Sequence, residues 1–118
     1  MAQALASRVL GGTAIVDSAG IDADTGAPAN SKAIVVMEKY GLDIKGHRSK
    51  DVEDLDLGAF DIIVAMKSWI ARILVSEYGA DPARLKELDI DDPHRGGLEE
   101  DYEQCAMKLE AVLPAVLQ

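Results

Sequence analysis

The chain has 118 residues, enough for one domain (1–118) with a single hydrophobic core. Its net charge of -9 at pH 7 repels nucleic acid and anionic lipid at long range, so neither is an expected partner. One cysteine excludes an internal disulfide, and two histidines far apart in the sequence offer no zinc-binding spacing. The apolar runs are too short to span a bilayer, so we expect a soluble, cytoplasmic protein.

The first part of the chain predicts a helix, a strand and a second helix. Residues 2–10 carry apolar side chains at helical spacing and are followed by two glycines, which favour a helix end. Residues 13–20, TAIVDSAG, have a β-branched apolar centre and are typical of a buried parallel strand. Asn30 or Ser31 is suited to cap a second helix that ends before Gly41.

The second part predicts two more strands and two more helices. Residues 61–66, DIIVAM, form a continuous apolar run, which indicates a strand covered on both faces. Ser68 is expected to cap a helix that ends at Gly79. Residues 85–90, LKELDI, alternate apolar and charged positions and predict a strand nearer the sheet edge. The last helix has an apolar stripe made of Tyr102, Cys105, Leu109 and Val112.

Alternating strands and helices indicate an α/β fold with a parallel sheet, in which ligands bind at the carboxyl ends of the strands. Ser18, Lys67 and Asp92 fall at those ends, although Lys67 gives no reason to assign it a role. Pro93 restricts the backbone of Asp92, and the glycines at 96 and 97 allow a sharp turn. The sequence therefore predicts a carboxyl group on a rigid loop, with a merely solvated turn as the alternative.

Four blocks in order, VDSAG, MEKYGLDIKGHRS, FDIIVAMK and IDDPHRGGLEEDYEQC, resemble the low molecular weight protein tyrosine phosphatase family, which includes arginine phosphatases and related arsenate reductases. The resemblance covers essentially the whole chain. It implies a three-layer sandwich around a parallel sheet with strand order 2-1-3-4. It also implies phosphomonoester hydrolysis through a cysteinyl-phosphate, with no metal or cofactor. The substrate would be a phosphoprotein or a small phosphomonoester, and arsenate reduction is disfavoured because it needs several redox cysteines.

The resemblance also assigns site residues. Asp92 matches the general acid of the family. Ser18 matches a serine that supports the phosphate loop by hydrogen bonding, with a strand-end serine that satisfies its own loop as the alternative. His94 and Arg95 stand where the tyrosine phosphatases usually carry two aromatic residues beside the acid. They are therefore candidate substrate-binding residues for an anionic or differently shaped substrate, with two solvated basic side chains as the alternative.

The chain departs from the family at the catalytic loop, which is a cysteine, five residues and an arginine. MAQALASRV resembles the helix directly after that loop. Cys105 is the one cysteine, Ala111 stands six positions later, and the place of Cys105 on the apolar stripe indicates an inert core thiol. We expect the chain as printed to be inactive. The alternatives are an active phosphatase whose true N-terminus lies upstream and a pseudophosphatase that acts as a binding or regulatory module.

The first strand of the family would lie between residues 13–20 and 61–66, in the middle of the sheet. Four buried aliphatic side chains in such a strand contribute roughly 6 to 12 kcal/mol. This is comparable to the net stability of a small domain, about 5 to 15 kcal/mol. We therefore expect the remaining strands to pair differently or a second copy to complete the sheet in a homodimer.

Overall fold

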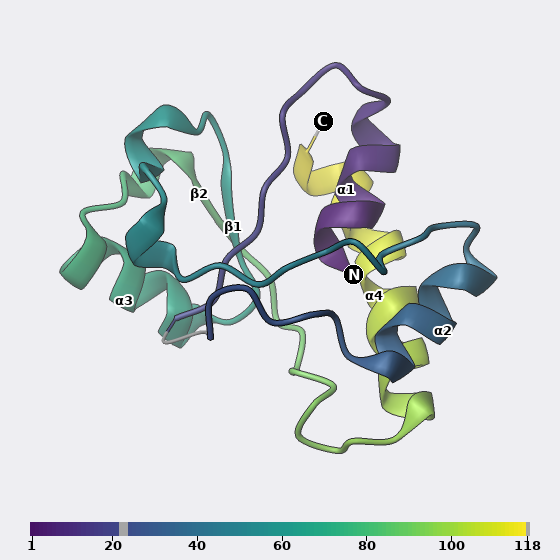
Figure 1. The fold of residues 1–118 in the computed structure, drawn as a ribbon. Helices are drawn as coiled ribbons and strands as arrows, with labels where there is room; N and C mark the ends of the chain where they lie inside the picture. The colour runs from purple at the N-terminus through teal and green to yellow at the C-terminus, as the bar shows by residue number, and fades with distance from the viewer. Residues whose placement is uncertain (22–23, 118) are drawn as a thin grey trace.

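The computed structural model describes residues 1–21 and 24–117. The helices among them are α1 (Ala2–Leu10), α2 (Ser31–Lys39), α3 (Ser68–Tyr78) and α4 (Glu99–Leu117). Strands β1 (Ile63–Ala65) and β2 (Leu85–Glu87) pair in parallel, with Ile63 opposite Leu85. Short 3-10 helices η1 (Val52–Asp54), η2 (Leu57–Ala59) and η3 (Pro82–Arg84) lie in the connections. Figure 1 follows this order along the chain.

Local capping explains most helix ends. The side chain of Asn30 accepts a hydrogen bond from the backbone N–H of Lys32 at the start of α2, as predicted. Gly11 and Gly79 follow α1 and α3 in the left-handed conformation, with φ of 59° and 70°. The predicted cap at Ser68 is wrong, because Lys67 keeps an extended backbone and occupies the cap position, so that Ser68 is already helical.

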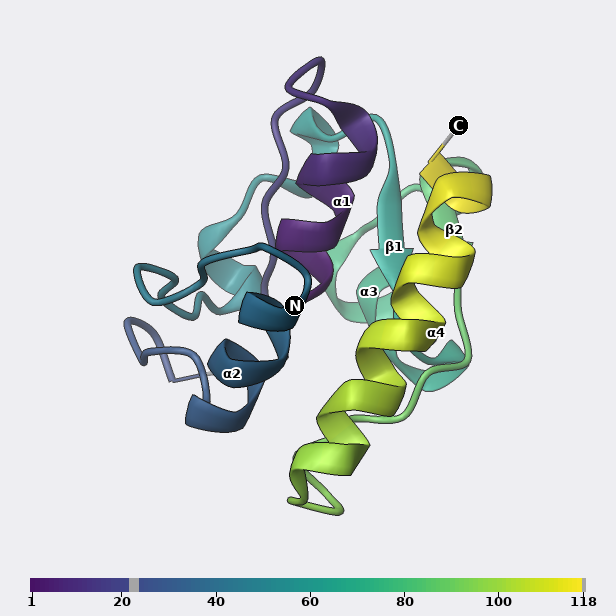
Figure 2. The same cartoon turned by 90° about the vertical axis from the view of Figure 1, so that its right-hand side faces the viewer.

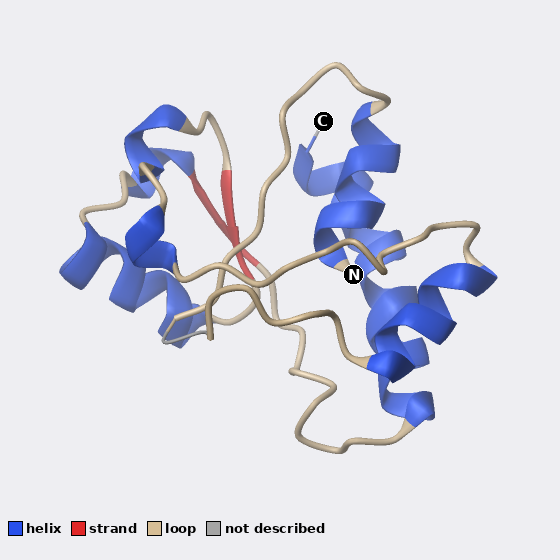
Figure 3. Ribbon diagram, in the orientation of Figure 1, coloured by secondary structure: helices blue, strands red, loops and turns tan. Residues whose placement is uncertain are grey.

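The sheet lies between two hydrophobic clusters. On one side, Ala65 of β1 packs with Ala71 and Leu74 of α3. On the other side, Met66 and Ile90 pack with the cluster around α4. Figures 1 and 3 show the same arrangement, with α3 on one side of the strands and α1 and α4 on the other. The predicted three-layer α/β architecture is therefore confirmed.

Helix α4 organises the larger cluster. Both α1 and α2 pack against it, and Figure 2 shows it running the length of this side of the molecule. Leu109 and Leu113 of α4 are each 2% exposed, and the predicted stripe is buried at Tyr102 and Cys105. The apolar stripe along α4 therefore determines how α1, α2 and α4 pack together.

The predicted strand at residues 13–20 does not form. Within the described residues the sheet has two strands, β1 and β2, and residues 13–20 contribute one isolated bridge, between Gly20 and Asp51. Ile15 is 92% exposed, because no strand formed by residues 1–21 or 24–117 lies beside it to share its backbone hydrogen bonds or cover its side chain. Re-pairing of this segment with β1 is thus not seen, and the homodimer that would complete the sheet stays a prediction.

The third predicted strand is shorter than expected, since β2 ends at Glu87. Its pairing nevertheless continues to residue 90. The backbone N–H of Leu88 donates to the carbonyl of Ala65 at 2.8 Å, and that of Ile90 to the carbonyl of Met66 at 3.0 Å. These bonds place the loop after β2 next to the end of β1.

Among residues 1–21 and 24–117, every helix is too short or too polar to span a membrane.

Candidate functional site

The loop that follows β2 is anchored by a buried residue. Ile90 is 5% exposed, and its backbone N–H is bonded to the end of β1. Asp91 and Asp92 come directly after this anchor, at the carboxyl ends of both strands. In parallel sheets this is the edge at which ligands bind. The structure therefore places Asp92 where the strand pattern predicts a site.

Asp92 opens a compact turn. Its Oδ1 accepts a hydrogen bond from the backbone N–H of His94 at 2.9 Å, and its carbonyl accepts one from the N–H of Arg95 at 3.2 Å. The turn closes with a bond from the N–H of Gly97 to the carbonyl of Pro93 at 3.0 Å, and Gly97 has a φ of 74°. One oxygen of the carboxyl group is thus held by the backbone, which gives the rigid mount that the Asp-Pro sequence predicts.

A cleft of about 340 Å³ lies between this turn and the first half of α4. Asp92 and Arg95 line it from the turn, and Gln104, Cys105 and Lys108 line it from the helix. His94 is not among the lining residues, and its backbone N–H, not its ring, is what contacts Asp92. Of the two candidate substrate-binding residues, the structure therefore brings Arg95 to the cleft.

Cys105 is buried at the wall of the cleft and is a free thiol. Burial raises the pKa of this thiol, and the negative charge of Asp92 raises it further. A thiol with a raised pKa stays protonated at neutral pH, and the protonated form is a poor nucleophile. The surroundings of Cys105 therefore suit the inert core role that the sequence indicates.

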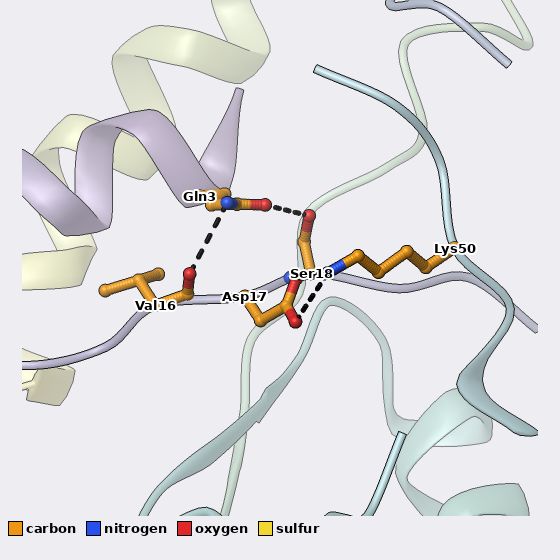
Figure 4. Close-up of polar contacts among 5 residues, drawn as sticks. All are labelled: Gln3, Val16, Asp17, Ser18 and Lys50. Atoms are coloured by element: carbon orange, nitrogen blue, oxygen red, sulfur yellow. Dashed lines mark hydrogen bonds and ion pairs between the residues drawn. The ribbon is translucent and has the colours of Figure 1, made fainter. Parts of the chain in front are cut away.

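Ser18 lies in a separate polar network (Figure 4). Its hydroxyl donates to Oε1 of Gln3 in the first turn of α1 at 2.5 Å. Its backbone N–H donates to Oδ1 of Asp17 at 2.9 Å, and Asp17 is paired with the ammonium group of Lys50 at 2.8 Å. The network connects the start of α1 to the segment after residue 15. Ser18 thus supports α1, and its predicted part in holding a phosphate loop stays a prediction.

The start of α1 contacts this network through Gln3, and Met1 packs against the cluster that contains Cys105. Burial lowers the pKa of His47, and the ammonium group of Met1 lowers it further. The same ammonium group opposes the rise in the pKa of Cys105. Met1 therefore lies near enough to influence both His47 and Cys105.

The Asp17–Lys50 pair predicts a loss of stability in acid. Burial raises the pKa of Asp17, but the bonds from Lys50 and Ser18 outweigh it and leave the pKa below its ordinary value. The contribution is therefore present at neutral pH and is lost as the pH falls below about 4. We expect Asp17→Asn to cost about 0.5 kcal/mol at pH 7 and less at pH 3 in urea unfolding. Asp61→Asn, at an exposed position, is the control, and an equal cost at both pH values would contradict the prediction.

Gly96 sits against the start of α4 and predicts a second stability effect. A Cβ at this position would overlap the carboxylate of Asp101, whose Oδ2 accepts the backbone N–H of Leu98 at 3.0 Å. Gly96→Ala should displace this capping carboxylate and destabilise the protein by about 1 kcal/mol. Gly46→Ala is the matched control, because a Cβ there meets nothing within 4 Å. Equal urea midpoints for the two variants would show that the cap does not depend on Gly96.

Lys67 is the site residue that sequence reasoning missed. Its ammonium group is paired with Oδ1 of Asp89 at 2.5 Å and with Oδ1 of Asp91 at 2.8 Å. These pairs span 22 and 24 residues of sequence. The sequence offered one signal for this ion pair: a lone lysine at the end of one strand, with an acidic run at the end of the next strand.

The whole chain matches a known family, and solved structures of that family share its fold. The sequence profile described as low molecular weight phosphotyrosine protein phosphatase matches residues 1–118. A Ralstonia nicotianae protein named probable low molecular weight protein-tyrosine-phosphatase EpsP is 31% identical, with 98% of this chain and 86% of that protein covered. The low molecular weight protein tyrosine phosphatase of T. tengcongensis is 30% identical and superposes with a TM-score of 0.86, covering 98% of this chain and 86% of that one.

A more distant structure supports the fold alone. The YwlE arginine phosphatase of Geobacillus stearothermophilus is 24% identical, with a TM-score of 0.76 and coverage of 94% of this chain and 79% of that one. The family profile matches all 118 residues, and the T. tengcongensis structure agrees with the α/β architecture described above. The chain belongs to the low molecular weight phosphotyrosine protein phosphatase family.

Proposed function

We propose that residues 1–118 carry the proton-donor side of a phosphomonoesterase centre and do not hydrolyse phosphomonoesters by themselves. The observation that supports this is the turn at Asp92, whose carboxyl group is held by the backbone beside a cleft at the strand ends. The sequence supplies no cysteine followed by an arginine six positions later, since Cys105 is followed by Ala111. A phosphate loop would have to come from residues outside 1–118.

With such a loop in place, the reaction is the one implied by the family. A cysteine thiolate attacks phosphorus, the bond from phosphorus to the leaving oxygen breaks, and Asp92 gives its proton to that oxygen. The Asp92 carboxylate then takes a proton from the water that attacks the cysteinyl-phosphate, the bond from phosphorus to sulfur breaks, and inorganic phosphate leaves the regenerated cysteine thiolate. No metal or cofactor takes part in this proposal.

Arg95 supplies the substrate contact in this proposal. It lines the cleft together with Lys108, so two cationic side chains face the space beside Asp92. Guanidinium groups bind phosphate and carboxylate through paired hydrogen bonds. We therefore favour a phosphoprotein or small phosphomonoester with further negative charge near the phosphate. A cytoplasmic location belongs to the same proposal.

Two proteins test the proposal: residues 1–118 alone, and the longest gene product that contains them. The first should not hydrolyse p-nitrophenyl phosphate above the buffer rate. If the second protein includes a cysteine followed six positions later by an arginine, it is here called the loop-containing protein. The loop-containing protein should hydrolyse p-nitrophenyl phosphate. Turnover by residues 1–118 that disappears in Asp92→Asn would refute the proposal.

A non-catalytic binding module is the second candidate. It is favoured by the cleft, because Arg95 and Lys108 line it without any contribution from a phosphate loop. Residues 1–118 could then present the cleft to a phosphorylated partner without breaking a bond. A gene product with no phosphate loop and no hydrolysis, which nonetheless binds a phosphopeptide through Arg95, would favour this candidate.

A further inference from the structure

Lys67 joins the end of β1 to both sides of the buried anchor before the Asp92 turn. Asp89 and Asp91 flank Ile90, and their carboxylates converge on one ammonium group at 2.5 and 2.8 Å. The two carboxylates are 90% and 81% exposed, whereas the Lys67 side chain is 28% exposed. The lysine is therefore the more buried partner, and two exposed carboxylates converge on it.

The position of these pairs along the loop matters more than their strength. The last backbone bond between β1 and this segment runs from the N–H of Ile90 to the carbonyl of Met66. The bond from Lys67 to Asp91 extends the connection by one residue, to the residue that precedes Asp92. Since Asp91 and Asp92 share a peptide unit, fixing Asp91 restricts the direction in which the Asp92 carboxyl group points.

The charges support the same role. Bonds to Asp89 and Asp91 raise the pKa of Lys67, and the bond from Lys67 lowers the pKa of Asp91. Lys67 and Asp91 therefore remain ionised over the neutral range. Asp91 also lines the cleft, where a free carboxylate would repel a phosphate dianion. Pairing with Lys67 reduces that repulsion beside the acid.

We propose that Lys67 is a positioning residue for Asp92, which holds the loop so that the acid meets the leaving oxygen. This inference rests on the proposed function, because it assigns Asp92 the role of proton donor. Exposed ion pairs contribute little to stability on average, so a purely structural role would give a small and uniform effect. A misplaced acid gives a selective effect, because only reactions with a poor leaving group depend strongly on proton donation.

The test uses the loop-containing protein with two substrates, phenyl phosphate and p-nitrophenyl phosphate. Lys67→Met should lower kcat about tenfold for phenyl phosphate, whose leaving group needs the proton, and about twofold for p-nitrophenyl phosphate. Lys67→Arg, which keeps the charge, should recover most of the loss. Lys67→Met in an Asp92→Asn background should cause no further selective loss, because the acid that it positions is gone.

The control is Lys45→Met, which removes a lysine paired with Glu38 outside the cleft and should leave both rates unchanged. Equal losses for both substrates, or a full additional loss in the Asp92→Asn background, would overturn the inference. If the gene product hydrolyses neither substrate, the proposed function fails, and the positioning is measured on residues 1–118 by amide exchange. The His94 N–H should then exchange about fivefold faster in Lys67→Met than in wild type, and an unchanged rate overturns the inference.

Discussion

Asp92→Asn in the loop-containing protein is expected to lower kcat for phenyl phosphate by about a hundredfold to ten-thousandfold. Asparagine has almost the shape of aspartate, and its Oδ1 can still accept the N–H of His94, so the turn should be retained. The amide cannot give a proton to the leaving oxygen. The loss should therefore appear in kcat, with KM nearly unchanged. Steady-state kinetics on the wild-type loop-containing protein and on its Asp92→Asn variant measure the loss in kcat.

The leaving group separates lost proton donation from a damaged fold. p-Nitrophenolate leaves without a proton more readily than phenolate, so Asp92→Asn should cost less with p-nitrophenyl phosphate. Asp61→Asn removes an exposed carboxylate before β1 and serves as the control. Equal losses for the two substrates, or wild-type rates with phenyl phosphate, would remove Asp92 from the role of general acid.

The helices could be predicted because their signals are local. Asn30 caps α2 through a bond to a residue two positions away, and Gly11 ends α1 by its own conformation. The stripe on α4 is read from steps of three and four residues. A strand is different, because its partner can lie anywhere in the chain. Residues 13–20 have the composition of a buried strand, yet Ile15 is 92% exposed because none of the strands in the described part of the chain pairs with it.

In the candidate site, too, the features set by neighbouring residues could be predicted, whereas the contacts between distant segments could not. Pro93 and the glycines after it predict a rigid turn, and the bonds of Asp92 and Gly97 within that turn are local. The contact of Lys67 with Asp91 joins two strand ends and depends on the sheet register. The order of His94 and Arg95 gave no indication of which side chain would line the cleft. That choice follows from how the turn packs against α4.

Leu109→Ala is expected to destabilise the fold by about 2 to 5 kcal/mol. Leu109 is 2% exposed and lies in the larger cluster, where α4 meets α1 and α2. Truncation removes its apolar contacts and leaves a cavity that the surrounding helices fill only in part. Small domains have a net stability of about 5 to 15 kcal/mol, so the loss is a large share of the total. Urea unfolding of residues 1–118, followed by circular dichroism, measures it.

Met107→Ala is the matched control, because Met107 lies two positions earlier on the same helix and is 64% exposed. Leucine and methionine have similar helix propensities, so replacement by alanine changes the intrinsic helix term almost equally in both variants. The difference in unfolding free energy between them therefore reports burial alone, and we expect about 2 kcal/mol or more. Equal midpoints would mean that α4 does not present Leu109 to α1 and α2. The cleft would then lose its support, because Gln104, Cys105 and Lys108 line it from the same helix.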